Sequence, residues 1–231
     1  MTVEAVLFDL YGTLAYVEEE VPDEVASELL VRRGYEVYPQ PFDASWRFVG
    51  FIDYPKYGYR SWETYLRRIL QRLGVKVDKE TLGELADLYK KTRWKIYPDV
   101  KEALDSVKKQ KLKTAVVTSI AKFKYIEALK PVRRKIDLIV DSHTFHCEKS
   151  NPKIYLKTLE TLKIKPQQAI MVGDEIKLDV ELPKKLGMKA ILLDRKGVYV
   201  LEGISKPDFI VSNLMEAVEI IFSANISKKI Y

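Results

Sequence analysis

The 231-residue chain has a single cysteine, Cys147, and no long apolar run. One cysteine excludes an internal disulfide, which is typical of the reducing cytoplasm, so we expect a cytoplasmic protein. No stretch approaches the roughly 18 consecutive apolar residues of a membrane-spanning helix. No basic segment leads an apolar one at the N-terminus, so we expect neither a membrane anchor nor a signal peptide. Asn and Gln are scarce beside Lys and Glu, a bias associated with growth at high temperature.

A strong charge of one sign is also missing. The chain has 39 Lys and Arg against 33 Asp and Glu, which gives a net charge of +6. This modest excess favours small anionic ligands, such as phosphorylated metabolites, and gives no reason to expect binding to nucleic acid. Hydrophobic residues make up 47% of the chain, enough for a packed core. The length allows either one large domain or a core with an insert, as a monomer or a homodimer.

The most informative stretch that is present reads Val6-Leu7-Phe8-Asp9-Leu10-Tyr11-Gly12-Thr13-Leu14. Its first three residues are typical of the end of a buried strand, and Gly12 permits a tight turn after it. Asp9 then stands at the carboxyl end of that strand. A carboxylate there points into the crevice where open α/β sheets bind ligands. The simpler alternative is an aspartate that closes an ordinary turn.

Strand-like and helix-like segments alternate from residue 98 onward, a pattern that predicts a parallel sheet with helices on both faces. We expect helices from about 98 and 121, over 152–162, and ending at Gly187, the last starting near Asp179 because Pro183 is best tolerated in a first turn. A final helix is expected after the last strand. The expected strands cover residues 113–118, 137–140, 169–172, 189–193 and 208–211.

Residues 16–97 lack the β-branched runs seen elsewhere and predict a helical insert. We expect helices from about 22 to 33, from Ser61 to Leu73, and over 79–92, with a loop over 35–45 where Pro39 and Pro41 interrupt the pattern. Eight of the 20 residues from Trp46 to Tyr65 are aromatic. They favour packing within a small helical core, and a wall of a substrate pocket is the alternative. Arg47 and Arg60 lie in this stretch and could bind a substrate anion.

The stretch from Asp9 to Thr13 resembles motif I of the haloacid dehalogenase superfamily, and three more motifs follow in the family's order. Thr118 ends an apolar run, as in motif II. Lys149 opens Lys149-Ser150-Asn151-Pro152-Lys153-Ile154-Tyr155, which is similar to the family's Lys-Pro-x-Pro-x-Ile-Tyr. The fourth motif, Gly-Asp-x-x-x-x-Asp, is matched by residues 173–179. The resemblance implies an α/β fold, a doubly wound, Rossmann-like parallel sheet with an inserted α-helical cap. The core would be residues 1–15 and 98–231 and the cap 16–97, with the site between them.

The resemblance also implies a role for each motif residue. Asp9 would be the nucleophile, and Lys149 and the Thr118 hydroxyl would bind the phosphate that it attacks. The phosphate would also contact Leu10, Tyr11 and Ser119. Two carboxylates and a main-chain carbonyl suit Mg²⁺, which prefers oxygen ligands. The expected metal set is Asp9, the carbonyl of Tyr11, Asp174 and, as an outer ligand or organiser, Asp179. For Asp174 and Asp179 the alternative is helix capping, and for Lys149 it is an ordinary exposed lysine.

Two departures from the family pattern bear on function. Tyr11 occupies the place of the second aspartate that serves phosphatases as general acid, as it does in the family's metal-free 2-haloacid dehalogenases. Those dehalogenases carry a small polar residue in place of Asp174, however, and a carboxylate beside Asp9 without a metal would be strongly repelled. His146 and Ser150 replace the family's usual Gly and Pro. His143 and His146 could act as general acids, but a structural role is the simpler interpretation.

Three functional hypotheses remain. The first is a Mg²⁺-dependent phosphatase of small phosphorylated metabolites that acts through an aspartyl-phosphate on Asp9. The second is a metal-free 2-haloacid dehalogenase in which Asp9 displaces halide and forms an ester. The third is a catalytically weak member that binds a phosphorylated ligand or a protein. The substrate itself cannot be identified, because the residues of the insert would select it.

Overall fold

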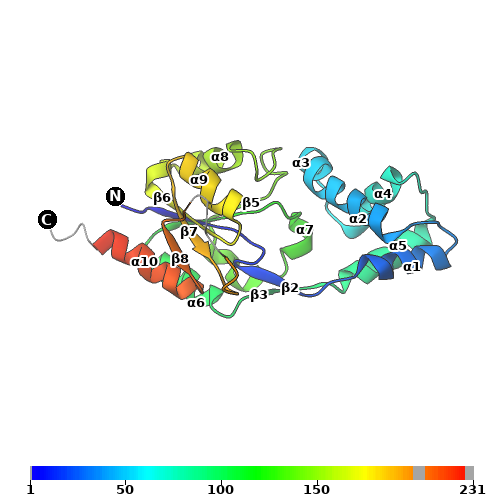
Figure 1. The fold of residues 1–231 in the computed structure, drawn as a ribbon, viewed down its shortest axis with the longest axis horizontal. Coiled ribbons are helices and arrows are strands. Elements are labelled where there is room, and N and C mark those ends of the chain that lie inside the picture. The colour runs from blue at the N-terminus through cyan, green and yellow to red at the C-terminus, as the bar shows by residue number, and fades with distance from the viewer. Residues whose placement is uncertain (1, 200–205, 227–231) are drawn as a thin grey trace.

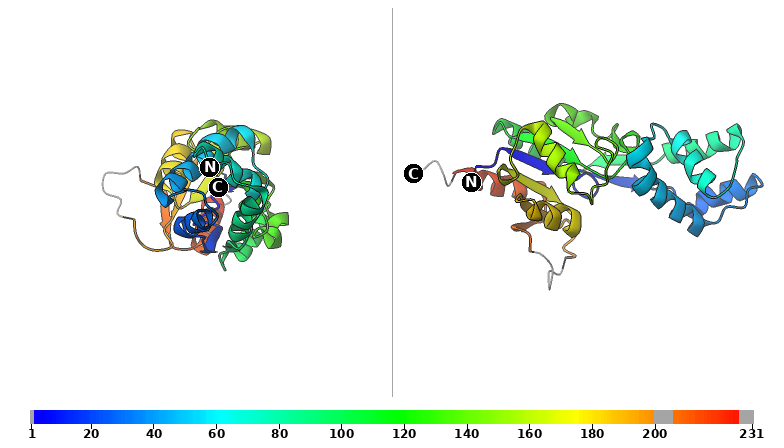
Figure 2. Two further views of the ribbon diagram at one scale, coloured as in Figure 1. Left: turned by 90° about the vertical axis from the view of Figure 1, so that its right-hand side faces the viewer. Right: turned by 90° about the horizontal axis from the view of Figure 1, so that it is seen from above.

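The structure, a computed structural model, describes residues 2–199 and 206–226 and is elongated (Figure 1). A sheet flanked by helices forms one end, and a group of helices forms the other. The two views of Figure 2 show the same end-to-end arrangement. The N-terminus and the last described helix both lie at the end farthest from the group of helices.

Among the described residues, six strands form one sheet in the order β5-β4-β1-β6-β7-β8, and every pair in it is parallel. β1 lies at its centre, and its register places Phe8 between Val116 of β4 and Val172 of β6. β1 and β6 are buried at every position, as expected for strands that helices cover on both faces. The six strands are β1 (Ala5–Phe8), β4 (Lys113–Val117), β5 (Leu138–Val140), β6 (Ala169–Gly173), β7 (Lys189–Leu193) and β8 (Phe209–Val211).

Helices cover both faces of this sheet, which confirms the predicted fold class. Apolar residues of α6 and α10 pack on one face and those of α8 on the other, because alternate residues of each strand point to opposite faces. Ile176 packs with β7 on the face where α9 lies. The helices of this part are α6 (Val100–Lys109), α7 (Lys122–Tyr125), α8 (Lys153–Leu162), α9 (Leu182–Lys185) and α10 (Leu214–Ile226).

Five helices from the first half of the chain form a second unit, here called the helical lobe. Its core brings together apolar faces of α1, α2, α4 and α5, including Phe42, Leu66 and Leu85. Ser61 caps α4 as predicted: its hydroxyl accepts from the Thr64 N–H, and the Thr64 hydroxyl accepts from the Ser61 N–H. The helices are α1 (Asp23–Arg32), α2 (Pro39–Phe48), α3 (Tyr54–Tyr57), α4 (Trp62–Arg72) and α5 (Lys79–Lys90).

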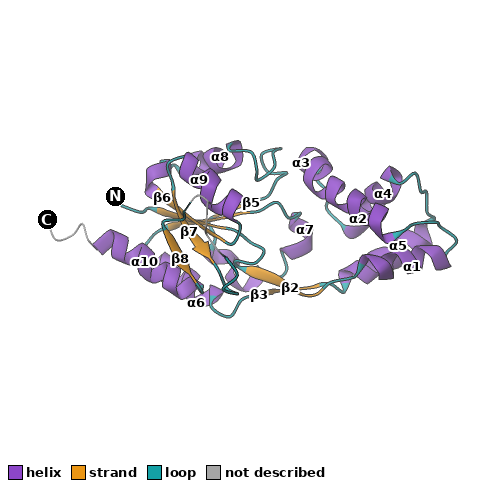
Figure 3. Ribbon diagram, in the orientation of Figure 1, coloured by secondary structure: helices purple, strands orange, loops and turns teal. Residues whose placement is uncertain are grey.

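Two expectations for residues 16–97 are wrong. The loop expected over 35–45 is mostly helix, because α2 begins at Pro39. Its prolines fall in the first turn, where a missing N–H costs nothing, so they start the helix rather than interrupt it. The segment also contains strands: β2 (Ala15–Glu19) pairs antiparallel with β3 (Arg93–Ile96). This ribbon, orange in Figure 3, joins the sheet to the helical lobe. Each strand depends on a partner about 80 residues away, which local patterns do not reveal.

Smaller differences occur in the second half of the chain. The helix expected from Ala121 is the short α7, and a 3-10 helix, Lys130–Lys135, follows before β5. Helical structure ahead of Gly187 begins at Ile176, three residues before Asp179, as the π-helix Ile176–Glu181 that leads into α9. No helix among the described residues has the length and apolar character needed to cross a membrane.

Candidate active site

Three polar side chains follow three adjacent strands at the carboxyl edge of the sheet. Asp9 follows the central strand β1, Thr118 follows β4 and Asp174 follows β6. The strand ladders continue into this edge: Asp9 N–H donates to the carbonyl of Val172 at 2.9 Å, and Thr118 N–H donates to that of Val140 at 2.9 Å. Because neighbouring strands lie only about 5 Å apart, motifs separated by more than 100 residues meet here.

Lys149 reaches the same place from the loop between β5 and α8. Its side chain is 3% exposed, and its ammonium forms ion pairs with a carboxylate oxygen of Asp9 and, at 2.7 Å, with Oδ1 of Asp179. Oδ2 of Asp179 accepts a hydrogen bond from the Glu175 N–H at 3.1 Å. Both oxygens of Asp179 are therefore engaged within the protein. The structure brings Lys149 and both expected carboxylates together, and Lys149 is not an ordinary exposed lysine.

Burial controls the ionisation of these groups. Burial raises the pKa of Asp9 to about 7; Lys149 opposes this rise and Asp179 adds to it. Burial, with the charge of Asp179, likewise raises the pKa of Asp174 to about 6. Burial disfavours the charged form of Lys149, but the carboxylates of Asp179 and Asp9 outweigh it and hold the pKa of Lys149 well above its ordinary value. Once ionised, the three carboxylates exceed the one ammonium in charge.

Asp174 is the carboxylate that this ammonium does not pair with. Its Oδ1 accepts a hydrogen bond from the Thr13 hydroxyl at 3.4 Å, and no Lys or Arg of the described residues forms an ion pair with it. Carboxylate oxygens of Asp9, Asp174 and Asp179 lie within 4.8 Å of one another. Hard oxygen donors with excess negative charge are the donor set that Mg²⁺ prefers, so these residues fit that ion.

Glycines allow these carboxylates to approach the main chain. Gly12 has a φ of +80°, and a Cβ placed there would lie 2.0 Å from Oδ2 of Asp174. A Cβ at Gly173 would lie 2.3 Å from the Asp179 carboxylate. A side chain at either position would therefore displace a carboxylate, which gives both motif glycines a steric reason.

Unpaired main-chain groups surround the nucleophile position. Within the described residues, the N–H groups of Leu10 and Tyr11 donate no hydrogen bond and the carbonyl of Tyr11 accepts none. Free amides in a turn can bind an anion, and a free carbonyl can bind a cation. The Thr118 hydroxyl accepts from the Ile120 N–H at 3.1 Å, which leaves its proton for an acceptor. Ser119 lies directly beside it and is half-buried.

The surroundings of the Tyr11 side chain make its hydroxyl a poor proton donor. It is 47% exposed, and its ring meets Trp94 of β3 edge-on at a centroid distance of 5.8 Å. Partial burial and the charges of Glu20 and Asp174 raise the pKa of its hydroxyl above the ordinary value of 10. Tyr11 therefore holds its proton more tightly than a free tyrosine does.

Other candidate residues lie outside this cluster. Nδ1 of His143 and Nδ1 of His146 lie 3.3 and 3.0 Å from the carbonyl of Pro55, so both face α3 of the helical lobe. Arg47 is 70% exposed and paired with Asp43 on the same helix, and Arg60 is exposed. The aromatic residues of the 46–65 stretch mostly pack with one another, with Trp46 stacked on Trp62 at 5.9 Å.

Two residues that support the site lie outside the roles that the motifs predict. Arg195, after β7, donates to the carbonyl of Thr13 at 2.9 Å and to both oxygens of Asp99 at 3.0 Å. It thereby holds the turn that carries Gly12 and Thr13. Tyr155 is buried in α8, and its hydroxyl donates to the carbonyl of Leu178, next to Asp179. Tyr155 stands in motif III and could have been singled out, whereas nothing local distinguishes Arg195 among 39 basic residues.

A family model described as haloacid dehalogenase-like hydrolase matches residues 3–187. The chain therefore belongs to the haloacid dehalogenase-like hydrolases, as its four motifs predict. It is 26% identical to the glyceraldehyde 3-phosphate phosphatase of Pyrococcus furiosus over 239 aligned positions, which cover 98% of this chain and 96% of that one.

Solved structures show the same relationship. A haloacid dehalogenase-type phosphatase from Thermococcus onnurineus superposes with a TM-score of 0.68 at 25% identity, over 95% of this chain and 98% of the other. A 2-haloacid dehalogenase from Pseudomonas syringae pv. Tomato superposes with a TM-score of 0.69 at 19% identity, over 96% and 99%. The second match speaks for the fold alone, because both branches of the family share it.

Proposed function

We propose that this hydrolase is a Mg²⁺-dependent phosphatase of small phosphorylated metabolites that acts through an aspartyl-phosphate on Asp9. One observation carries the proposal: Asp174, a partly buried carboxylate with which no Lys or Arg of the described residues forms an ion pair, lies beside the Asp9–Lys149 ion pair. Such a group is costly unless a cation neutralises it. The likeness to enzymes named phosphatases supports the same conclusion.

In this proposal each residue of the cluster has one task. Asp9, Asp174 and the carbonyl of Tyr11 would hold Mg²⁺, and Asp179 would orient Lys149 and the loop that follows β6. The ion supplies positive charge that lowers the repulsion between the carboxylate nucleophile and an anionic phosphate. Lys149, which is paired with Asp9, would add fixed positive charge. The Thr118 hydroxyl and the amides of Leu10, Tyr11 and Ser119 donate hydrogen bonds to phosphate oxygens.

The reaction then proceeds in two displacements at phosphorus. The free carboxylate oxygen of Asp9 attacks, an O–P bond forms, and the bond to the leaving oxygen breaks. The leaving oxygen takes up a proton from water, because Tyr11 is a poor donor. A water molecule next attacks phosphorus, and the bond between phosphorus and the Asp9 oxygen breaks. The proton that this water loses neutralises the hydroxide left by the first step, so inorganic phosphate is released and Asp9 is restored. Lys149, held by Asp179, offsets the negative charge on the phosphoryl group in both steps.

We also propose that residues 16–97 act as a cap over a core of residues 1–15 and 98–231. The helical lobe faces the carboxyl edge of the sheet with its α3, which contacts α7 of the sheet part, and the β2–β3 ribbon is its covalent connection. A phosphorylated metabolite would be enclosed between the two parts, a usual position for a small-molecule site. A cytoplasmic monomer or homodimer without nucleic acid or membrane partners is consistent with the composition.

The metal-free 2-haloacid dehalogenase is the second candidate. Tyr11 at the general-acid position favours it, because displacing a halide needs no proton. Asp174 disfavours it, since burial and the charge of Asp179 raise the pKa of Asp174 to about 6, so a charged carboxylate here is costly without a cation. The absence of an aspartate at position 11 also leaves a third candidate, a slow enzyme that chiefly binds phosphorylated ligands.

A metabolite panel assayed for phosphate release with and without Mg²⁺ tests the proposal. We expect release that requires Mg²⁺ and is lost in Asp9→Asn, whose fold stays intact because Lys149 keeps Asp179 as partner. Asp87→Asn, an exposed carboxylate on α5, is the matched control. Halide release from a 2-haloacid without metal would establish the dehalogenase instead. Ligand binding without turnover would establish the third candidate.

A further inference from the structure

One side chain of the helical lobe bridges two loops of the sheet edge. Tyr54, in α3, is 3% exposed, and its hydroxyl donates to Oδ2 of Asp141 at 2.5 Å. The same hydroxyl accepts from the N–H of Lys122, at the start of α7, at 3.1 Å. The first loop follows β5 and the second follows β4, where Thr118 stands. Tyr54 therefore ties the lobe to two strand ends that border the site.

Asp141 is the residue through which this contact reaches the site. It is 6% exposed, and no Lys or Arg of the described residues forms an ion pair with it. Its Oδ1 accepts from the N–H and the hydroxyl of Thr144 at 2.9 and 2.8 Å, which closes the loop on itself. One carboxylate thus binds the loop with one oxygen and the helical lobe with the other. A buried oxygen that lost its only donor would be left unsatisfied, at substantial cost.

The loop that Asp141 closes is the one that ends on Lys149. Seven residues separate them, and the loop is internally bonded from the N–H of Cys147 to the carbonyl of Ser142. His143 and His146, in the middle of this loop, both face the Pro55 carbonyl, next to Tyr54 in α3. A short, internally bonded loop transmits displacement from one end to the other. Movement of α3 would therefore displace the Lys149 ammonium.

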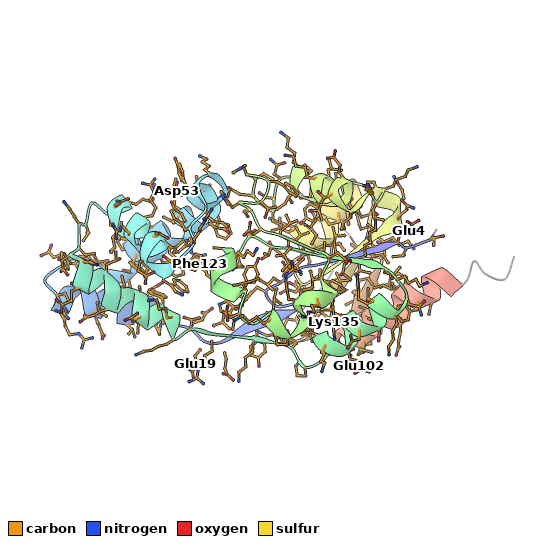
Figure 4. The ribbon with its side chains drawn as sticks, turned by 180° about the vertical axis from the view of Figure 1, so that it is seen from behind. Glu4, Glu19, Asp53, Glu102, Phe123 and Lys135 are labelled. Atoms are coloured by element: carbon orange, nitrogen blue, oxygen red, sulfur yellow. The ribbon has the colours of Figure 1, made fainter. Side chains whose placement is uncertain are left out.

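A second contact holds the same two parts together from α7. The Lys124 ammonium lies 4.1 Å from the ring centroid of Trp46 and 3.9 Å from that of Tyr65. Phe123, labelled in Figure 4, meets Trp62 edge-on at 5.2 Å. The helix whose first N–H binds Tyr54 is thus also inserted among aromatic side chains of the lobe. The described conformation is a docked one, in which Tyr54 contacts the loop that leads to Lys149.

We propose that the Tyr54–Asp141 hydrogen bond is a latch that couples docking of the helical lobe to the position of Lys149, which makes both of them positioning residues for phosphoryl transfer. The proposal rests on the proposed function for its kinetic consequence, but the docking itself does not. Burial and the bond to Asp141 raise the pKa of Tyr54, so its hydroxyl remains a donor throughout the neutral range. Neither residue contacts the reacting atoms.

Tyr54→Phe tests the latch because it removes the hydroxyl and keeps the buried ring. Tyr57→Phe is the matched control, since its side chain lies on the same helix, is 63% exposed, and its hydroxyl forms no hydrogen bond with the described residues. A hydrogen bond to a charged group is worth a shift of about 10- to 100-fold in the docking equilibrium. Amide hydrogen exchange in residues 142–149 should accelerate by that factor in Tyr54→Phe and stay unchanged in Tyr57→Phe.

The kinetic measurement separates positioning from support of the fold. With Mg²⁺ saturating, we expect Tyr54→Phe to lower kcat by about tenfold or more with little change in KM, because Lys149 acts on the transferring group. Asp141→Asn should do the same, and the double variant should be no slower than the worse single variant, because both remove one hydrogen bond. Should Tyr54→Phe fail to fold, hydrogen exchange in residues 142–149 and kcat of Asp141→Asn test the proposal instead.

Each outcome decides the proposal. Faster exchange confined to residues 142–149 together with a lower kcat supports it. Wild-type exchange in that loop overturns the latch, and faster exchange with wild-type kcat overturns the coupling to Lys149. If the wild-type protein releases no phosphate from any substrate, the proposed function fails while the exchange measurement still tests the latch.

Discussion

Binding of Mg²⁺ should be strongly coupled to pH. Asp9 and Asp174 have pKa values of about 7 and about 6 in the metal-free site, and both must lose their protons to bind a cation. Lowering the pH from 8 to 5 takes Asp9 two units below its pKa and Asp174 one unit below its own. The dissociation constant should therefore rise by about 1,000-fold over this range, or about 4 kcal/mol.

Calorimetric titration of Mg²⁺ measures this coupling directly. At pH 6, binding should release between one and two protons, seen as a difference in apparent enthalpy between two buffers of unlike ionisation enthalpy. Asp174→Ala should lose most of the affinity, because Asp9 and one carbonyl remain as ligands. The exposed variant Asp87→Asn should bind as the wild type does. Equal dissociation constants at pH 5 and 8, with no proton release, would refute the metal site.

The same ionisations affect the stability of the metal-free protein. The folded pKa of Asp9 lies above its unfolded value of 3.8, so the folded state holds more protons between those values. The stability that this carboxyl contributes is complete below pH 3.8 and is lost as the pH rises through 7. Mg²⁺ should therefore raise the melting temperature much more at pH 8 than at pH 5. An equal rise at both values would contradict the assignment of Asp9 as a metal ligand.

Three further changes have definite expected results. Tyr11→Asp supplies a carboxyl at the position of the general acid of phosphatases. Because general acid catalysis contributes about 10²- to 10⁴-fold, this change should raise kcat/KM for an alkyl phosphate relative to an aryl phosphate. An unchanged ratio would mean that another group donates the proton. Burial lowers the pKa of Lys124 to about 7 from 10.5, so the unfolded chain binds more protons than the folded one between these values. This lysine therefore makes the free energy of unfolding rise with pH from 7 to 10.5. Lys124→Met should remove this pH dependence, measured by urea denaturation at pH 7 and 9. Ser61→Ala should lower the free energy of unfolding by about 1 kcal/mol through the lost cap of α4, and no loss would show that the Ser61 hydroxyl is dispensable.

The parts of the fold that the sequence predicted are those with local signals. Strand β6 is an apolar run bounded by Gln168 and Gly173, and α4 begins at a serine that caps it. The ribbon of β2 and β3 was missed because neither strand is apolar on its own, and each is stabilised by pairing with the other. Pro39 explains the difference at α2: proline interrupts a helix in its interior, but at a first helical position, as here, it favours the start of one.

In the candidate site, too, the sequence predicts the residues that stand in motifs and not the contacts between distant segments. Asp9, Lys149, Asp174 and Asp179 stand in motifs, so their meeting followed from the order of the strands. The roles assigned to them remain predictions. What the motifs did not reveal are contacts between distant segments that have no common pattern, such as Arg195 with the turn at Thr13. The Tyr54–Asp141 pair is of this kind too, since residues 87 positions apart pair only because α3 docks on the sheet edge.

The supply of a proton to the leaving group links these observations to the choice of substrate. In the proposed site Asp174 would bind the cation. Asp179 is bound to Lys149 and Glu175, and the raised pKa of Tyr11 makes its hydroxyl a poorer acid than usual. Both histidines face the Pro55 carbonyl rather than the cluster of carboxylates. Among the described residues near Asp9, none is then a neutral donor of suitable pKa. If the chain is the proposed phosphatase, we therefore expect it to hydrolyse fastest those phosphates whose leaving oxygen is stable as an anion, such as acyl or aryl phosphates, and to hydrolyse sugar and polyol phosphates comparatively slowly.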